Sequence, residues 1–483
     1  MNRVALHPGD QVLFNGGDTF GGLLYMAPGS GGTSTAPVSF ASFGTGRATI
    51  HGGTGGAFFA YDAGGVSINN LNFVGGGAAI NSKDGVAFYN DLAGNIKLAY
   101  IRIANVDVGG FGKAGISIGG WNGSSGFTDV QITSSATHDN RLHGLISYGP
   151  AFNAVAPAYA NSSFYVGHVS AYRNLGDPAL TTNSGNGIVL GSVQSATIER
   201  SGAWANGTSC KARQCGAGIW TYDSTLVTIQ YNESYTNGSA SRVDGDGFDL
   251  DQNVSGSYLQ YNYSHDNGGA GILDYTGLGN LSHANNTIRY NISENDARTN
   301  DGSLTLGGHV SKDAIYGNTI FVSPAAGASP AAVKVVGYPA GVSVRNNILD
   351  ATGATPAISS PAIGTGAVLF QQNDYPGTFR VVWGFSSFSA IDAWRQATGQ
   401  ERLGGNPTGL VVDPSLVSPG QGGTIVDPDR LPMLQAYTLT SASPLIGAGL
   451  NLESAFGTNP GSQDFYGVQI DQATALSVGA SQN

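Results

Sequence analysis

The sequence predicts an all-β solenoid, in which short strands repeat coil after coil. Charged residues make up 11% of the 483 residues and 74 residues are glycine, whereas about 25% of the residues in a typical globular domain are charged. A glycine followed by an apolar residue recurs through the centre of the chain, and a run ending in asparagine follows most of these copies. Repeated short strands with an asparagine column are typical of β-solenoids.

The glycine repeat is the clearest of these signals. Its seven copies begin at Ala114, His143, Asn186, Ala217, Asp246, Ala270 and Asp301. One coil cannot bury its own apolar face, so successive coils must stack. Asn232, Asn262 and Asn291 hold the same place in three copies. We expect each of these amides to hydrogen-bond to the amide one coil away, because asparagine tolerates left-handed turns and forms ladders.

No linker interrupts the chain, so we predict one domain over residues 1–483. It would comprise N-terminal coils (1–110), regular central coils that carry the site (111–320), and irregular C-terminal coils with a cap (321–483). One segment, "SAIDAWRQATG", predicts a short helix near the C-terminus, with Ser389 as N-cap, Asp392 at N3 and Gly399 at its end. Such a helix would cover the end of the solenoid.

Charge and cysteine content bear on the partners and the cellular location of the protein. The net charge of −11 argues against nucleic acid and anionic membranes as partners, because both require a basic surface. No apolar run is long enough to span a membrane. The start, "MNRVALHPGD", lacks the apolar region of a signal peptide, and we expect that a leader was removed. Cys210 and Cys215 predict a short disulfide, which favours a secreted or periplasmic protein. The sequence does not predict the oligomeric state.

Side chains alternate across a strand, so the repeat also predicts which residues share a face. The residue after each repeat glycine is apolar in six of seven copies and should point inward: Ile116, Leu145, Ile188, Ile219, Phe248, Ile272 and Ser303. The next position should point outward: Ser117, Ile146, Val189, Trp220, Asp249, Leu273 and Leu304. The position two further on should also point outward: Gly119, Tyr148, Gly191, Tyr222, Asp251, Tyr275 and Leu306.

Four acidic residues, Asp244, Asp246, Asp249 and Asp251, crowd the stretch "RVDGDGFDLDQN". The register places Asp249 and Asp251 on one outward face, with the aromatic residues Trp220, Tyr222, Tyr275 and Tyr148 on other coils. Carboxylates beside flat rings suit a carbohydrate-binding groove. The alternative is a solvent-facing strand with an aromatic ladder that stiffens the sheet. Asp274 falls inward, which requires either a buried partner or a slip in register.

Two further residues are candidates for substrate binding. Arg242 lies in one of several long loops that precede the repeat strand and should stack as a wall of the groove. His265 ends the coil that carries the acidic residues, in a "SHDN" turn that resembles the "THDN" turn of His138. Because the turn occurs twice, a structural role for both histidines is the alternative.

With these residues laid out, the centre of the chain resembles the right-handed parallel β-helix proteins of the pectin lyase-like superfamily, with three short strands per coil. The opening "HPGDQVLFNGGDTF" and the closing "SPLIGAGLNL" resemble the ends of secreted members. The resemblance implies an enzyme that acts on polysaccharides. "DGFD" is similar to the Asp-Gly-x-Asp strand of polygalacturonase-type hydrolases, which implies a catalytic role for Asp246. The paired aspartates of the next coil and the Arg-x-Lys motif of that family are absent; only Asp274 is present.

The leading hypothesis is an inverting glycoside hydrolase that needs no cofactor, with Asp249 and Asp251 as acid and base and Asp246 assisting. Outward neighbours on one strand lie about 6.6 Å apart, close to the roughly 6.5–9.5 Å between the carboxyl groups of inverting enzymes. A Ca²⁺-dependent polysaccharide lyase or uronate epimerase is one alternative, with Asp246, Asp249 and Asp251 as metal ligands and Arg242 as base. A non-catalytic glycan-binding or tailspike-like protein is another.

Overall fold

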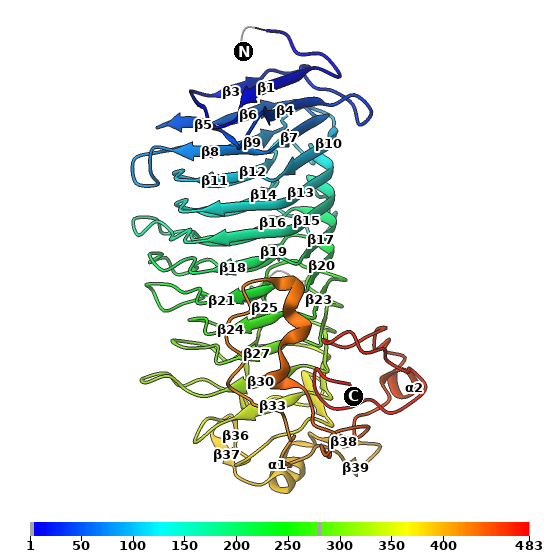
Figure 1. Cartoon of the computed structure of the whole chain (residues 1–483). Coiled ribbons are helices and arrows are strands. Elements are labelled where there is room, and N and C mark those ends of the chain that lie inside the picture. The colour runs from blue at the N-terminus through cyan, green and yellow to red at the C-terminus, as the bar shows by residue number, and fades with distance from the viewer. Residues whose placement is uncertain (1–3, 278–281, 483) are drawn as a thin grey trace. The chain divides into compact units, whose positions relative to one another are not determined.

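The computed structural model describes residues 4–277 and 282–482, which form two compact units. The first unit comprises Met1–Thr228 with Asn237–Val243, and the second comprises Ile229–Thr236 with Asp244–Asn483. Each unit is a parallel β-solenoid (Figure 1), so the predicted all-β, right-handed parallel β-helix is confirmed. The single domain and its three segments stay a prediction.

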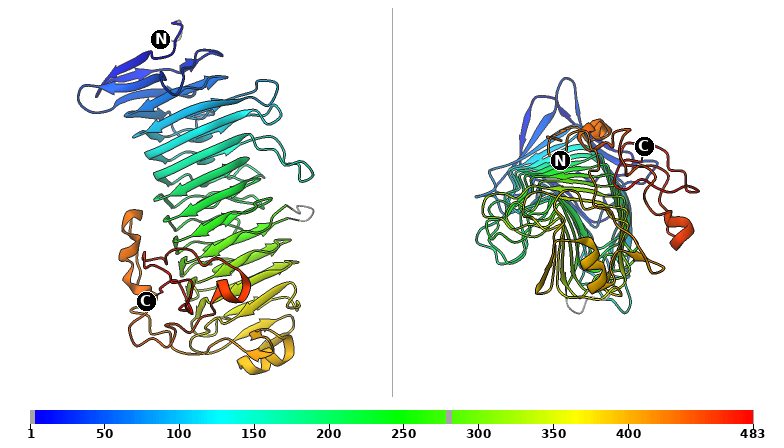
Figure 2. Two further views of the ribbon diagram at one scale, coloured as in Figure 1. Left: turned by 90° about the vertical axis from the view of Figure 1, so that its right-hand side faces the viewer. Right: turned by 90° about the horizontal axis from the view of Figure 1, so that it is seen from below.

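In the first unit each coil adds strands to parallel rows (Figures 1 and 2). The row that carries the glycine repeat, here called the repeat row, contains β3 (Leu24–Met26), β6 (Phe58–Tyr61), β9 (Val86–Tyr89), β12 (Ala114–Gly119), β14 (His143–Tyr148), β16 (Asn186–Gly191) and β19 (Ile219–Tyr222). The other rows contain β1 (Gln11–Asn15), β2 (Thr19–Gly21), β4 (Val38–Phe43), β5 (Ala48–Gly53), β7 (Val66–Asn69), β8 (Leu71–Gly75), β10 (Lys97–Ala104), β11 (Asp107–Gly109), β13 (Gly126–His138), β15 (Asn161–Tyr172), β17 (Val193–Glu199) and β18 (Gly202–Trp204). The division between the units falls within β20 (Thr225–Gln230).

The second unit repeats this arrangement. Its repeat row contains β22 (Phe248–Leu250), β25 (Ile272–Thr276), β28 (Leu304–Gly308), β31 (Val333–Gly337), β34 (Ile358–Ser360) and β36 (Val381–Trp383), with β37 (Ser386–Phe388) antiparallel to β36. The other rows contain β21 (Glu233–Tyr235), β23 (Tyr258–Gln260), β24 (Tyr263–His265), β26 (Thr287–Arg289), β27 (Ile292–Glu294), β29 (Ala314–Tyr316), β30 (Thr319–Val322), β32 (Val342–Arg345), β33 (Ile348–Ala351) and β35 (Val368–Gln371). A short hairpin joins β38 (Arg402–Leu403) and β39 (Asn406–Pro407).

The predicted inward column is confirmed in six of its seven positions. In the first unit Ile116 pairs with Leu145, Leu145 with Ile188, and Ile188 with Ile219, all fully buried. In the second unit Phe248 pairs with Ile272. These apolar side chains form the core of their units, which is the strongest reason for the coils to stack.

The predicted register of the seventh repeat copy is wrong by one residue. Ile272 pairs with Leu304 rather than with Ser303, so Leu304 and Leu306 point inward and are buried. Gly307, not Leu306, lies opposite Tyr275. A shift of one residue moves a strand's whole side-chain set to the other face, and burial of the two leucines decides which register forms.

The expected asparagine ladder forms in the second unit. The side-chain amide of Asn232 donates to Asn262 Oδ1, and Asn262 donates to Asn291 Oδ1, at 3.0 Å each. The ladder continues through Asn318, Asn347 and Asn373. Each ladder amide therefore links the coil before it and the coil after it: Asn262 donates to Ile229 O and to Asn291 Oδ1.

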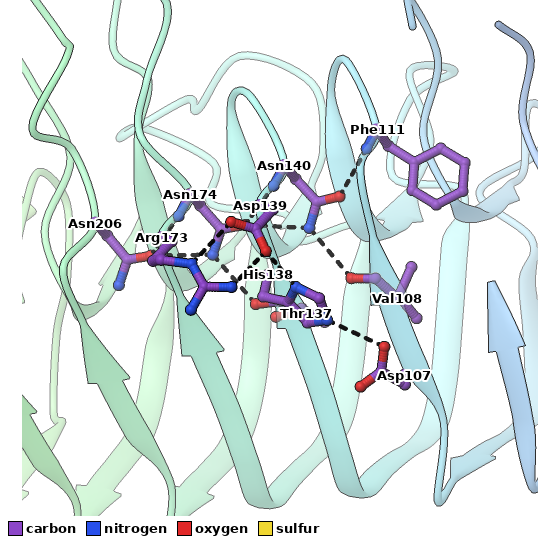
Figure 3. A network of polar contacts seen from close by, with 10 residues as sticks. All are labelled: Asp107, Val108, Phe111, Thr137, His138, Asp139, Asn140, Arg173, Asn174 and Asn206. Carbon is purple, nitrogen blue, oxygen red and sulfur yellow. Dashed lines mark hydrogen bonds and ion pairs between the residues drawn. The ribbon is translucent and has the colours of Figure 1, made fainter. Parts of the chain in front are cut away.

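A parallel ladder in the first unit was not predicted. It runs from Asn140 through Asn174 and Asn206 (Figure 3). Asn140 follows His138, whose ring nitrogens contact Asp107 and Asp139. The His-Asp-Asn turn therefore supplies a ladder amide in both of its copies, since Asn140 donates to Asn174 and Asn267 donates to Asp296.

The helix near the C-terminus forms, but its start differs from the prediction. α1 (Ile391–Thr398) begins after Ala390, which makes no side-chain cap hydrogen bond, so Ser389 is not the N-cap. Gly399 ends the helix in a left-handed conformation, as expected. Trp394 is fully buried against Phe370 and Trp383, so this helix closes the core at one end of the second unit.

The C-terminal segment was expected to be irregular, and it contains short helical turns: η1 (Pro428–Met433), η2 (Gln435–Tyr437) and α2 (Leu452–Phe456). Figures 1 and 2 show this segment in orange and red beside the coils of the second unit. Tyr437 is fully buried, and its hydroxyl donates to Glu294 on β27 at 2.7 Å. The segment therefore covers the β24–β27 face with apolar packing and buried hydrogen bonds.

The predicted disulfide between Cys210 and Cys215 is present, with Cα atoms 5.9 Å apart. It closes a short loop in the first unit. The backbone N–H of Ala240 donates to Cys210 O, so the loop containing Arg242 stacks on this loop. Among residues 4–277 and 282–482, no helix has the length and apolar character needed to cross a membrane.

Candidate functional site

The four aspartates lie on and beside β22 in the second unit. Asp244 and Asp246 precede the strand, Asp249 is its central residue and Asp251 follows it. Gly247, between Asp246 and Asp249, lies close to the neighbouring row, because a Cβ at this position would lie 2.2 Å from Ser264 Oγ. The Gly-apolar repeat thus lets the chain pass close to the neighbouring row at the start of the acidic strand.

Asp246 is fully buried. Its Oδ1 accepts a hydrogen bond from Ala270 N at 2.5 Å, and its Oδ2 has no hydrogen-bond partner among the described residues. Burial, followed by the negative charges of Asp244 and Asp301, raises the pKa of Asp246 well above its ordinary value. Asp246 therefore tends to hold a proton, since a buried carboxylate without a cation is unstable.

Asp249 occupies the predicted outward column, where it pairs with Leu273. The side chain is nevertheless only 6% exposed, so it is not the solvent-facing carboxylate of the alternative hypothesis. Burial raises its pKa well above the ordinary value, and the charges of Asp251 and Asp246 raise it further. Within the described chain its Oδ1 has no hydrogen-bond partner. A protonated carboxyl with an uncommitted oxygen is suited to proton donation.

Asp251 is half-buried and remains in contact with solvent. The ring of Tyr275 on β25 is also half-buried, and its pKa is raised by burial and then by the charges of Asp251 and Asp244. The structure therefore brings Tyr275 to the acidic cluster, as the register predicted. This part of the site combines a more accessible carboxylate with a half-buried aromatic residue.

The sequence analysis did not place two charged residues, Lys334 and Asp301, near the acidic strand. Asp249, Leu273, Thr305 and Lys334 occupy one outward column of successive strands. Lys334 Nζ lies 3.6 Å from Asp301 Oδ1. The error in register at Ser303 hid this column, although the alternation Val333–Lys334–Val335 in the sequence already places Lys334 outward.

The aromatic residues Trp220, Tyr222 and Tyr148 belong to the first unit. Trp220 is 7% exposed, and its indole N–H donates to Asn186 Oδ1 at 2.8 Å. Its ring packs beside Tyr222 with centroids 5.3 Å apart. Trp220 is therefore a packed residue rather than the open stacking platform that we expected.

Tyr148 stacks on Trp121, with ring centroids 5.2 Å apart, and Trp121 is 59% exposed. Trp121 was missed because it lies just after its strand, beyond the positions of the repeat.

Arg242, the predicted wall residue, is exposed and belongs to the stretch Asn237–Val243 of the first unit. The four aspartates of the acidic stretch belong, from Asp244 on, to the second unit.

The structure does not bring His265 to the acidic residues. It lies on β24, in a different row of the second unit from β22, and is 2% exposed. Its ring stacks on Tyr235 and Tyr263, and Nε2 lies 3.3 Å from Glu233 Oε1. These contacts give His265 the structural role that was the alternative for this repeated turn.

Metal binding was considered for Asp246, Asp249 and Asp251 under the lyase hypothesis. Their oxygens do not converge into a three-ligand group; among the described residues, only Asp274, His283 and Asp313 do so. The geometry of these three aspartates therefore does not fit a Ca²⁺ site. Asp274 points inward with a buried partner, His283, which resolves the question of its register.

Comparisons with known proteins return structural similarity alone. No family model matches the chain, and no curated protein matches it. A GH136 lacto-N-biosidase from Eubacterium ramulus is 17% identical, with a TM-score of 0.49 over 67% of this chain. The match spans 60% of the lacto-N-biosidase chain.

Two other solved structures are similar over most of the chain. Pectate lyase Pel9A is 16% identical over 99% of this chain and 89% of its own, with a TM-score of 0.47. The A-module of the Azotobacter vinelandii mannuronan C-5 epimerase AlgE4 is 15% identical over 83% of this chain and 91% of its own, with a TM-score of 0.49. At these identities and TM-scores the similarities establish no activity for this chain.

Proposed function

We propose that this protein is a polysaccharide-degrading enzyme, specifically a glycoside hydrolase that inverts the anomeric configuration. The observation that carries the proposal is the pair formed by Asp249 and Asp251: a buried carboxyl whose pKa is raised well above its ordinary value, followed two residues later by a more accessible one. Hydrolysis of a glycosidic bond needs one protonated and one ionised carboxyl group.

In this mechanism Asp249 protonates the oxygen of the leaving sugar. Asp251, which is closer to solvent, removes a proton from the attacking water on the other face of the ring. Asp246 assists as a second buried carboxyl group beside Asp249, because neither ionises readily while the other carries charge. Tyr275 offers an aromatic face to a sugar ring near Asp251. A disulfide-bonded, acidic protein of this kind fits a secreted or periplasmic location.

The test is product analysis on a panel of polysaccharides and oligosaccharides, with and without chelator. A hydrolase produces new reducing ends without ultraviolet absorbance, and nuclear magnetic resonance of the first product shows the inverted anomer. Asp249→Asn should abolish this activity. Asp392→Asn is the matched control, because Asp392 is on α1 and its side chain is 88% exposed.

Other outcomes would overturn the proposal. Unsaturated products that absorb in the ultraviolet indicate a lyase, and a chelator-sensitive reaction would point to its Ca²⁺-dependent form. A change in uronate composition without cleavage indicates an epimerase. Retention on a glycan column with no product indicates a binding protein.

A further inference from the structure

Three fully or almost fully buried side chains meet in the interior of the second unit, away from the outward column. Asp274 lies on β25, His283 lies in the segment before β26, and Asp313 lies just before β29. They are 0%, 0% and 1% exposed. His283 Nε2 lies 2.7 Å from Asp274 Oδ1 and 3.9 Å from Asp313 Oδ2. All three ligand atoms lie within 4.8 Å of one another.

The position of Asp313 does not by itself require a carboxylate. Asp313 Oδ1 accepts a hydrogen bond from Asn286 N, just as Asn286 Oδ1 accepts one from Ser257 N in the preceding coil. An asparagine therefore serves at the same place one coil earlier. The second oxygen of Asp313 has no hydrogen-bond partner in the described chain.

Asp296 provides an internal comparison. It also replaces asparagine in a ladder, where its Oδ1 accepts from the side-chain amide of Asn267 at 2.8 Å. Its Oδ2 accepts from Ser293 Oγ at 2.7 Å. Both oxygens of Asp296 are thus used by the fold, whereas one oxygen of Asp313 faces His283 instead.

Unpartnered polar atoms leave room for a ligand in the cluster. Asp274 Oδ2 and His283 Nδ1 are, like Asp313 Oδ2, buried without a hydrogen-bond partner among the residues described. Two ionised aspartates with one protonated histidine would leave a net negative charge in the core, which is unfavourable unless a proton or a cation compensates it. A divalent cation with a neutral histidine would neutralise both carboxylates.

We propose that Asp274, His283 and Asp313 bind a first-row transition-metal dication, of which Zn²⁺ is the representative. One imidazole nitrogen and two carboxylate oxygens are typical donors for such ions, whereas Ca²⁺ and Mg²⁺ favour all-oxygen sites. Because the ligands are buried, the ion enters as the chain folds and links two successive coils. The site is separate from the carboxyl groups of the proposed hydrolase, and its test does not require activity.

The metal content of the full chain tests the proposal. Protein produced in zinc-supplemented medium and dialysed against EDTA should retain one zinc per chain, since the folded core shields the ion. Unfolding in guanidinium chloride with EDTA should release it. Asp313→Asn should lose the zinc while keeping the ladder hydrogen bond, because asparagine serves at this place in the preceding coil. Asp296→Asn is the matched control and should keep the zinc.

A melting experiment provides a second readout. Wild-type protein unfolded, stripped and refolded with Zn²⁺ should melt several degrees above protein refolded without it, because binding to the folded state raises stability. This shift should be absent in Asp313→Asn. Another first-row dication bound at one equivalent supports the same site.

Three outcomes would overturn the proposal: wild-type protein without a stoichiometric metal, calcium in its place, or equal zinc content in Asp313→Asn. A proton shared between Asp313 and Asp274, beside a charged His283, would then account for the cluster.

Discussion

The outward columns of the repeat row differ between the two units, although the backbone is the same. In the first unit the column carries Val189 and Trp220, which are buried apolar and aromatic side chains. In the second unit it carries Asp249, and the half-buried Asp251 follows just after the strand. The inward column is apolar in both units. The coil is therefore stabilised by inward side chains and amide ladders, and the outward column carries packed apolar side chains in one unit and acidic side chains in the other.

The largest expected effect is on turnover. Asp249→Asn keeps the shape of the side chain and removes its proton, so turnover should fall by about 10²–10⁴-fold. Folding stability at pH 7 should hold or rise. A carboxyl with a raised folded-state pKa contributes most stability below its unfolded value and loses that contribution as the pH rises. Steady-state kinetics and thermal melting check both points. Activity near that of the wild type would show that this column is not catalytic.

A substitution in the outward column of the first unit should lower the free energy of unfolding. Trp220→Ala removes a buried ring and should destabilise the unit by about 3–5 kcal/mol. Trp121→Ala is the control, because that ring is 59% exposed, and its change should lie within about 0.5 kcal/mol. Urea unfolding followed by tryptophan fluorescence measures both. Equal effects would contradict the burial of Trp220.

The two histidine turns should differ in their dependence on pH. Burial alone lowers the pKa of His265, but hydrogen bonds to Asp266 and Glu233 outweigh it and raise the pKa from 6.5 to about 9. The corresponding stability is fully present below pH 6.5 and is lost as the pH rises through about 9. The rise in the pKa of His265 corresponds to about 3 kcal/mol of folding free energy between these two pH values.

Urea unfolding at pH 6.5 and pH 9 measures this loss, which should shrink in His265→Gln. His138→Gln should change it little. The side chain of His138 is 21% exposed and its carboxylate partners are 37% and 44% exposed, so solvent screens those pairs. The same loss of stability in wild type and His265→Gln would assign the pH dependence to another group.

The smallest expected effect is that of the disulfide in the first unit. Cys210→Ser with Cys215→Ser should cost roughly 2 kcal/mol, because the closed loop is short. Hydrogen exchange measured by mass spectrometry should increase mainly around residues 207–218. A general increase across both units would show that the bond supports more than its own loop.

The periodicity of the sequence was sufficient for the fold and for much of the register. Glycine followed by an apolar residue marks a strand because only glycine fits where Gly247 meets Ser264. The asparagine column predicted a ladder because stacked amides can satisfy one another. The error at Ser303 arose because a one-residue shift leaves the local pattern intact, and only burial of Leu304 and Leu306 distinguishes the two registers.

The candidate site was predictable in part. The sequence placed Asp249 on the outward column and Tyr275 near Asp251, because strand alternation is local. It did not predict that Asp249 is buried, that Trp220 bonds to Asn186, or that Lys334 shares the column of Asp249. These features depend on side chains from other coils.

The sequence by itself determined the solenoid, its inward column and the crowding of acidic residues, since each follows from spacing along the chain. Only the tertiary structure decided the protonation and surroundings of those residues. Asp249, Asp274 and His265 are polar residues in similar strands, yet one is a buried acid on the outward column, one joins His283 and Asp313 in the core, and one pairs with Glu233. Burial and charge depend on distances between coils, and residues about 24 to 43 positions apart in the sequence become neighbours only after the chain has wound.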